Sequence, residues 1–166
     1  MFIIIPEHVP SEVCSDMIEI YENNKDSAKV WRDTQPLNLE NISNQEELNR
    51  CKRVIKYVNN AAVSFFGRGN YVERGEIVKW PMGSYQDYHI DNTRESTTFT
   101  SLTYLNEDFE GGETDFITEN FSVKPKVGRT ILFDGKKFEH GVNKITEGIR
   151  YTFALWYSHN IMDCFV

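Results

Sequence analysis

Two histidines and an aspartate in this chain have the types and the spacing that a metal site needs. His89 and Asp91 are separated by one residue, so on a strand both side chains point to the same face. His140 comes from a distant segment and would complete a set of two imidazoles and one carboxylate. Such a set covers one face of an octahedral metal ion and leaves the opposite positions open. We therefore expect His89, Asp91 and His140 to hold a catalytic metal ion.

Arg150 adds a second chemical function to this set. It follows His140 by ten residues, past a turn signal at residues 146–148, so we expect it on the strand next to that of His140. Its planar guanidinium could clamp a carboxylate through two parallel hydrogen bonds. Open metal positions are typical of non-haem Fe(II) oxygenases, and a carboxylate clamp beside them suggests 2-oxoglutarate as a cosubstrate. Taken alone, Arg150 would instead be interpreted as a surface residue paired with Glu147.

The composition indicates a single globular domain over residues 1–166. The hydrophobic content of 40% and the aromatic content of 13% are typical of a chain that folds around a core. A net charge of −7 argues against non-specific nucleic-acid binding, so we expect no nucleic-acid partner. The apolar run at residues 1–5 stops at Pro6 and is too short for a signal peptide or a membrane span, so we expect a first strand and no membrane partner.

The three cysteines bear on the cellular compartment. Cys14, Cys51 and Cys164 are odd in number and do not have the spacing of a zinc site. We interpret them as reduced thiols, which predicts a cytoplasmic protein.

Two stretches have the periodicity of amphipathic helices and form a predicted helical support over residues 11–67. Ser11 is the expected N-cap of the first helix. Ser43 and Glu46 form a capping-box pattern before the second, which should end near Gly67. Between the two helices, residues 25–41 are polar and irregular. The apolar faces would carry Val13, Met17, Ile20 and Tyr21 in the first helix, and Leu48, Cys51, Ile55, Val58, Ala62 and Phe65 in the second.

The remainder of the chain has the texture of short strands. Segments rich in Val, Ile, Thr and aromatic residues alternate with glycine and proline turn signals. The expected strands are residues 76–80, 88–91, 97–106, 114–118, 129–133, 140–144 and 150–158. This pattern predicts a mainly β fold, a sandwich or jelly roll with its core at about residues 71–160. The two N-terminal helices would pack on one sheet, and the site would lie at the other mouth.

Residues 77–158 resemble a known enzyme family. The segment from Ser101 to Thr114 is similar to a YLN…F.GGET.F run, and Pro125, Gly128 and Phe133 match the P..G….F run that follows. The closing H.V….G.R…..W run is matched by His140, Val142, Gly148, Arg150 and Trp156. These runs together resemble the prolyl 4-hydroxylase-like branch of the Fe(II)/2-oxoglutarate-dependent dioxygenases, which implies the double-stranded β-helix form of the jelly roll.

The resemblance implies a role for each matching residue. His89, Asp91 and His140 would hold Fe(II), Arg150 would pair with the distal carboxylate of 2-oxoglutarate, and Tyr104 would donate its hydroxyl to the same end. The implied co-reactants are 2-oxoglutarate and O2, with ascorbate as a candidate reductant. The family often has tyrosines nine and three residues before the first ligand. This chain has Trp80 and Gln86 there, so those contacts with the cosubstrate differ.

The substrate side rests on the resemblance alone. Trp31 and Arg32 lie where relatives have a substrate-side strand, and Trp156 would pack beside the metal. Loops around residues 68–74 and 92–96 could form a lid. Hydroxylation of a prolyl residue in a peptide or protein is the leading hypothesis. A hydroxylase of a free amino acid or other small molecule, and a non-catalytic jelly-roll binding module, are the alternatives.

Overall fold

A six-stranded antiparallel sheet forms one wall of the protein, whose computed structural model describes residues 2–67, 70–91 and 94–165. Its central strand, β12, pairs with β3 on one side and with β5 on the other. Segments far apart in the sequence are therefore joined side by side. In spatial order the strands are β1 (Phe2–Ile5), β9 (Thr130–Phe133), β5 (Thr97–Tyr104), β12 (Ile149–Ser158), β3 (Tyr71–Pro81) and β2 (Gln35–Asn38).

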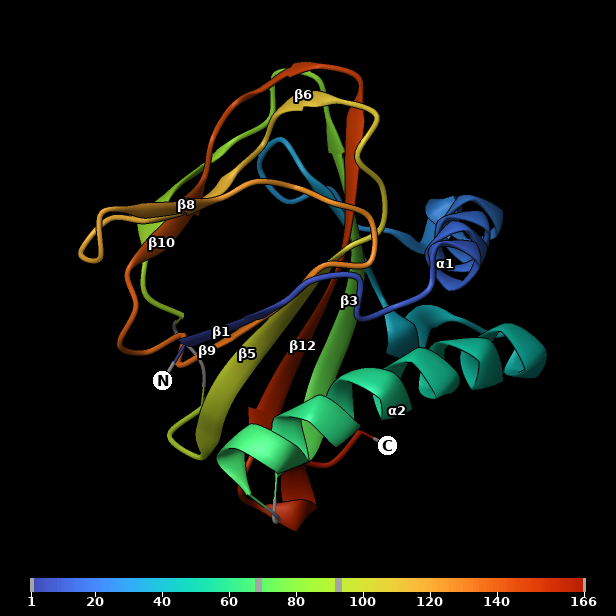
Figure 1. Cartoon of the computed structure of the whole chain (residues 1–166). Coiled ribbons are helices and arrows are strands. Elements are labelled where there is room, and N and C mark those ends of the chain that lie inside the picture. The colour runs from blue at the N-terminus through green and yellow to red at the C-terminus, as the bar shows by residue number, and fades with distance from the viewer. Residues whose placement is uncertain (1, 68–69, 92–93, 166) are drawn as a thin grey trace.

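A smaller sheet faces the first (Figure 1). Its four strands, in spatial order, are β4 (Gln86–His89), β10 (His140–Val142), β7 (Thr114–Phe116) and β8 (Phe121–Val123). A two-stranded ribbon joins β6 (Glu110–Gly111) to β11 (Ile145–Glu147). The prediction of a mainly β architecture is confirmed.

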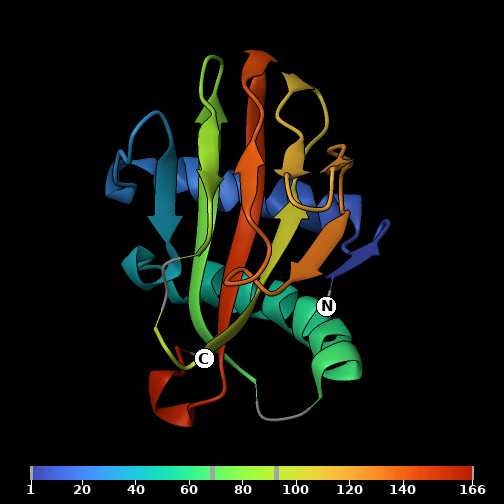
Figure 2. The ribbon, with the colours of Figure 1, turned by 90° about the vertical axis from the view of Figure 1, so that its left-hand side faces the viewer.

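Two helices cover the face of the larger sheet that is turned away from the smaller sheet (Figure 2). They are α1 (Ser11–Asn23) and α2 (Gln45–Phe66), and their apolar faces share one core with the sheet, as predicted. Short 3-10 helices occur at η1 (Lys25–Ser27), η2 (Leu39–Asn41) and η3 (Ile161–Asp163). Within the described residues, no helix has both the length and the apolar character needed to cross a membrane.

The predicted N-caps of both helices are wrong by one residue. Helix α1 begins at Ser11 with Pro10 as its N-cap, so Ser11 lies inside the first turn. Helix α2 is capped by Asn44, whose side chain accepts hydrogen bonds from the backbone N–H groups of Glu46 and Glu47. Asn is as good a cap as Ser, so two adjacent candidates could not be separated by residue type. The predicted end at Gly67 is confirmed by its positive φ of 84°.

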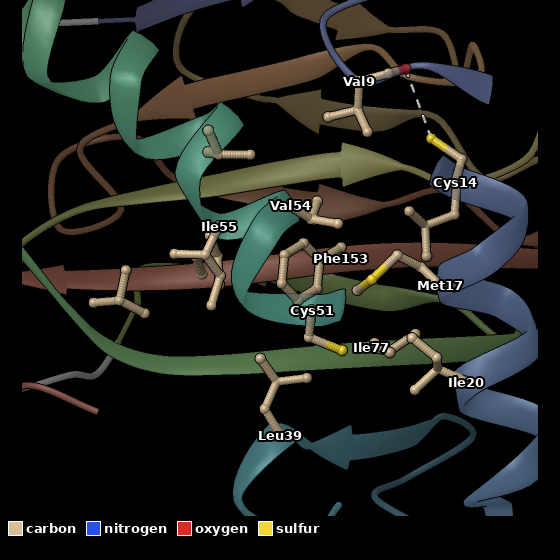
Figure 3. Packing of buried hydrophobic residues seen from close by; sticks show 14 of the residues in the cluster. Val9, Cys14, Met17, Ile20, Leu39, Cys51, Val54, Ile55, Ile77 and Phe153 are labelled. Atoms are coloured by element: carbon tan, nitrogen blue, oxygen red, sulfur yellow. Dashed lines mark hydrogen bonds between the residues drawn. The ribbon is translucent and has the colours of Figure 1, made fainter. Parts of the chain in front are cut away.

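The core between the helices and the larger sheet consists of buried side chains, most of them apolar. Figure 3 shows Met17, Cys51 and Phe153 converging from α1, α2 and β12, and none of these side chains is exposed. Burial raises the pKa of Cys14 to about 11 and that of Cys51 to about 12, so both thiols stay protonated. One predicted contact is wrong: Phe65 is 46% exposed, and its neighbour Phe66 stacks on Phe99 instead.

The opposite face of the larger sheet turns toward the smaller sheet. Because side chains alternate along a strand, β12 sends Phe153 and Leu155 into the helix-side core and places Arg150, Thr152 and Trp156 on the other face. The inner face carries two small apolar clusters. One contains Val78, Trp80, Val142 and Ile145, and the other contains Tyr104, Phe116, Val123, Ile131 and Phe133.

Several predicted strand boundaries need correction. Strand β2 forms inside the stretch that was predicted to be irregular, because β3 supplies a pairing partner that local sequence does not reveal. Strand β3 begins at Tyr71, so Arg74 lies in a strand and not in a lid loop. The short strands β6, β8 and β11 were not predicted. Residues 68–69 and 92–93 of the predicted lid lie outside the described residues.

Candidate active site

The structure brings His89, Asp91 and His140 together between the two sheets. One potential ligand atom from each lies within 4.8 Å of the other two. His89 ends β4 and is in register with His140 on β10. Asp91 lies two residues beyond the end of β4, so the expectation that it shares a strand with His89 is wrong. Its backbone N–H instead donates to the Gly135 carbonyl at 2.8 Å, which anchors the segment.

Hydrogen bonds orient each of the three side chains. The Nδ1 of His140 lies 2.9 Å from the Phe138 carbonyl, and the Nδ1 of His89 lies 3.0 Å from the Asp87 carbonyl. The two Nε2 atoms lie 3.8 and 3.7 Å from Oδ1 of Asp91, respectively. Partners of this kind fix the tautomer and the ring direction of metal-binding histidines.

The Asp91 carboxylate is held from its other side. Thr100 on β5 donates to its Oδ2 at 2.6 Å, which leaves Oδ1 turned toward the imidazoles. A Cβ at Gly135 would overlap this carboxylate, so only glycine fits at this position. The larger sheet therefore helps to position a ligand whose own segment belongs to the smaller sheet.

The charge states of these groups suit a divalent cation. Burial favours a higher pKa for Asp91, but contact with His89 and the charge of His140 outweigh it and lower the pKa. Burial lowers the pKa of His140. Burial also acts to lower the pKa of His89, but contact with Asp91 and the Asp87 carbonyl raise it overall. An ionised carboxylate beside imidazoles is a donor set for first-row divalent metals, which displace imidazole protons on binding.

Arg150 is the largest fully buried side chain in the described structure, and its charge has no anionic partner there. Its Nη2 donates to Thr114 Oγ1 at 3.2 Å, but Nε and Nη1 have no hydrogen-bond partner among the described residues. Its guanidinium lies 4.9 Å from the ring centre of Trp80 and 5.2 Å from that of Tyr104. Burial lowers its pKa. A buried cation with unpaired N–H groups is costly. The surroundings of the Arg150 guanidinium, formed by Trp80, Tyr104 and Thr114 and called the anion pocket below, are therefore suited to an anion.

Tyr104 and Thr114 form the polar wall of this anion pocket. The Tyr104 hydroxyl lies 2.7 Å from Thr114 Oγ1 and 3.2 Å from the Val123 carbonyl. The backbone at Gly112 has a φ of +69°, and a Cβ there would lie 2.9 Å from Cδ of Arg150. The second glycine of the GGET run is therefore needed both for its backbone conformation and for close passage over the arginine.

The anion pocket and the three candidate ligands lie on facing sheets. The prediction that Arg150 returns on the strand next to that of His140 is wrong, because β12 belongs to the larger sheet and β10 to the smaller. The two are linked through β7, where Phe116 is in register with His140 and Thr114 contacts Arg150. Two residues along a strand span about 7 Å, so the pocket lies a short molecule's length from the ligands.

The predicted substrate-side residues lie in two places. Trp156 is in register with Thr100, which donates to Asp91, so it lies on the strand next to the residue that supports this candidate ligand. Trp31 is 48% exposed in a tight turn closed by its two hydrogen bonds with Thr34. Arg32 at this turn has a φ of +52°. Its charge acts to lower the pKa of His89, which indicates that the turn lies on the same side of the molecule as the candidate metal site.

Three residues that matter for the geometry were not predicted. Thr100 supports Asp91, Thr114 supports Arg150, and Arg74 stacks at 3.9 Å on the ring of Trp156. Thr100 shares the parity of Tyr104 along one strand, so strand periodicity could have identified it. Thr114 closes the GGET run. Nothing in the local sequence distinguishes Arg74, because its contact depends on the register of β3 with β12.

Comparison with known proteins gives one match to a family as a whole. Residues 75–158, half of the chain, match the model of the 2OG-Fe(II) oxygenase superfamily. This segment contains the three candidate ligands, Arg150 and Tyr104.

Among curated proteins, human prolyl 3-hydroxylase 2 is 44% identical over 66 residues. The match covers 36% of this chain, and the chain spans only 9% of the length of that relative.

Two solved structures share the fold over nearly the whole chain. The viral collagen prolyl hydroxylase of Paramecium Bursaria Chlorella virus-1, in its 2OG complex, has a TM-score of 0.73 at 18% identity and covers 95% of this chain and 94% of its own. A Trichoplax adhaerens prolyl hydroxylase, in complex with a hypoxia inducible factor oxygen degradation domain peptide fragment, has a TM-score of 0.76 at 21% identity and covers 95% and 83%. The predicted jelly roll is confirmed.

Proposed function

The chain belongs to the 2OG-Fe(II) oxygenase superfamily, and from that premise we propose that it hydroxylates a prolyl residue of a peptide or protein. One observation carries the proposal: Arg150 is fully buried with Nε and Nη1 unpartnered among the described residues, and strand β7 links it to the cluster of His89, Asp91 and His140. The prolyl substrate is supported by the relatives, since the sequence match is to a prolyl 3-hydroxylase and one structural neighbour was solved with a peptide.

His89, Asp91 and His140 are the residues that would hold Fe(II). Their Nε2 and Oδ1 atoms face one another, and their remaining polar atoms are occupied by carbonyls or by Thr100. Two neutral nitrogens and one carboxylate oxygen fit Fe(II), and this set leaves positions for further ligands. The residues present therefore fit the family's metal.

Arg150 would bind the distal carboxylate of 2-oxoglutarate. Its Nε and Nη1 are without partners among the described residues, and its Nη2 uses only one of two hydrogens on Thr114. One parallel pair of donors, Nη2 with either Nε or Nη1, is therefore left for a carboxylate. The Tyr104 hydroxyl, which now faces Thr114 and the Val123 carbonyl, could turn to give a third hydrogen bond. The spacing of about 7 Å along β7 suits a five-carbon diacid that reaches from the metal to this pocket.

Bound Fe(II) and 2-oxoglutarate supply the oxidising power that converts a C–H bond to C–OH. The protein contributes orientation and a dry surrounding. The rings of Phe133 and Phe116 lie 4.7 and 5.9 Å from the His140 ring, and both phenylalanines are at least 98% buried. These rings would keep water from the inner side of the site, while the rim at His89, whose side chain is 31% exposed, would stay open to the substrate.

Trp31, Arg32 and Trp156 would contact the substrate at this rim. The first two project from an exposed turn, and Trp156 lies one strand from the support of Asp91. An indole ring beside the reacting centre offers a broad apolar surface for the compact, apolar ring of proline.

Turnover of defined peptides tests the proposal. The Fe(II)-loaded protein is incubated with 2-oxoglutarate, O2, ascorbate and proline-containing peptides, and succinate and the gain of one oxygen atom are measured together. We expect both signals with proline peptides and neither when alanine replaces proline. NMR of the product would place the hydroxyl at carbon 3 or carbon 4. Succinate formed with free amino acids but with no peptide would contradict the peptide substrate and favour a small-molecule hydroxylase.

A further inference from the structure

Glu76 is a partly buried carboxylate that the steps above do not use. Its strand neighbours Gly75 and Ile77 face the helix-side core, where a Cβ on Gly75 would meet Leu39 and Leu155. Glu76 therefore projects from the opposite face of β3 together with Val78, which packs toward the smaller sheet. Its side chain is only 19% exposed.

The Glu76 carboxylate lacks the partners that a buried charge needs. Its one charged contact is Arg74, with Nε at 3.6 Å, and no donor among the described residues makes a hydrogen bond to it. Burial raises its pKa, opposed only by the charge of Arg74. Glu47, a buried acid on the helix side, accepts hydrogen bonds from Asn23 and Asn24 at 2.9 and 2.7 Å. The contrast indicates that Glu76 is left ready for a donor that arrives from outside.

Two side-chain contacts and one pair of register partners connect Arg74, the ion-pair partner of Glu76, to the candidate metal site. Arg74 stacks on Trp156, Trp156 is in register with Thr100, and Thr100 donates to Asp91. Glu76 thus lies along the same face as the residues that would meet the substrate.

The residues beside Glu76 complete a binding position. Asn38 on β2 and Ala154 on β12 are its register partners. The Asn38 Oδ1 accepts from the Glu40 backbone, and its amide nitrogen makes no hydrogen bond within the described structure. Ala154 adds only a methyl group. A carboxylate acceptor next to a carboxamide donor complements the N–H and C=O of a peptide bond.

We propose that Glu76, with Asn38 beside it, binds a backbone amide of the substrate peptide and so sets which residue reaches the metal. This inference rests on the proposed function, because it specifies how a peptide substrate is held. Glu76 acts here through binding, and the oxidation itself is left to the metal site.

A first test needs no substrate. Glu76→Gln removes the buried charge, and Glu40→Gln, at an exposed acid next to Asn38, is the matched control. If Glu76 is kept for binding, its neutral variant should melt at an equal or higher temperature, by up to about 4 °C. A drop of more than about 2 °C relative to the control would show that the charge stabilises the fold through Arg74, and would overturn the inference.

A second test measures peptide binding to the full chain loaded with Ni(II) and 2-oxoglutarate. Glu76→Ala should weaken binding about tenfold, the loss expected for a hydrogen bond to a charged group, while Glu40→Ala should not. Peptides N-methylated at one amide at a time complete a double-mutant cycle. One methylated position should weaken the wild type about tenfold and leave Glu76→Ala unaffected. An equal response of both proteins at every position would overturn the inference.

The same panel separates this inference from the proposed function. Alanine-for-proline peptides that bind with the same dependence on Glu76 would support the inference while contradicting a prolyl substrate. If Glu76→Ala binds and hydroxylates proline peptides as well as the wild type does, the prolyl function is supported and the role of Glu76 is overturned. A wild-type protein that binds no peptide at all would overturn both.

Discussion

The two faces of the larger sheet are built on opposite principles. On the helix side, Met17, Cys51 and Phe153 are completely buried, and the buried charge of Glu47 has two amide donors. On the inner side, the charges of Arg150 and Glu76 are fully and partly buried, and within the described residues neither has the partners that such a charge needs. Two neutral hydroxyls on the helix side, Ser101 and Tyr157, also lack a described hydrogen-bond partner, but an unpaired hydroxyl costs far less than an unpaired charge. The helix-side face therefore provides stability, and the inner face is reserved for ligands.

One strand serves both faces. Along β12, Phe153 and Leu155 enter the helix-side core, while Arg150, Thr152 and Trp156 face the smaller sheet. Substitutions at neighbouring positions of a single strand should therefore have opposite effects, one on folding and the other on ligand binding. The following substitutions test this separation.

The largest effect is expected at His140. His140→Ala should abolish turnover and weaken metal binding by more than about hundredfold, because even residues that only orient a metal ligand contribute roughly tenfold to hundredfold. Metal affinity is measured by titration of the metal-free protein. His159→Ala, at an exposed histidine, should leave both quantities unchanged. Wild-type turnover by a folded His140→Ala protein would contradict the assignment of the inner face as the metal-binding face.

Phe153→Ala should have the largest effect on stability. The side chain is completely buried between α1, α2 and the sheet, and removal of such a ring costs about 3–5 kcal/mol. Urea unfolding of the metal-free protein measures the loss. The protein that remains folded should bind metal with unchanged affinity. A folded variant that had lost its metal affinity would show that the two faces are not independent.

Arg150→Met should show the reverse pattern. Binding of 2-oxoglutarate should weaken by about 2–3 kcal/mol, the range for hydrogen bonds to a charged group. The ligand-free protein should be as stable as the wild type or more stable, because an unpaired buried charge is replaced by an apolar chain. Calorimetric titration and thermal melting measure the two effects. Arg53→Met, at an exposed arginine, serves as the control. Strong destabilisation of the ligand-free protein by Arg150→Met would contradict a role of Arg150 in binding an anion.

The smallest effect is expected at the start of α2. Asn44→Ala should lower the free energy of unfolding by about 1 kcal/mol through loss of the cap, with no change in the affinity for metal or 2-oxoglutarate. Ser43→Ala should have almost no effect, since Ser43 precedes the cap. Equal losses of unfolding free energy in the two variants would support the capping box of Ser43 and Glu46 that the sequence suggested.

The parts of the structure that follow from local pattern could be predicted from the sequence. The faces of both helices, the strand-rich half and the inward alternation around Tyr104 are examples. The cap of α2 was missed because Ser43 and Asn44 are adjacent residues with similar capping preference. The cap of α1 was missed because Pro10, which makes no side-chain cap hydrogen bond, holds the N-cap position before Ser11. Strand β2 was missed because its identity depends on pairing with β3.

The candidate site could be predicted in identity but not in arrangement. His89, Asp91, His140 and Arg150 were all named as candidates from the sequence. The structure groups the first three within 4.8 Å, and it places Arg150 on the facing sheet, linked to them through β7. Spacing alone put Arg150 on the strand next to that of His140, whereas the chain crosses to the facing sheet after β10. The contact of Arg74 with Trp156 depends on strand register, which residue types do not encode.

Anaerobic titration with Fe(II) and then 2-oxoglutarate tests the central claim most directly, because it asks whether one metal and one diacid bind together on the inner face. The visible absorption band of the iron chelate is followed in the wild type, His140→Ala and Arg150→Met. We expect a band in the wild type, none in His140→Ala, and a band in Arg150→Met only at about hundredfold higher 2-oxoglutarate, which is the loss of 2–3 kcal/mol expressed as affinity. A folded wild-type protein that gives no band, or a band of equal strength in all three proteins, would contradict it.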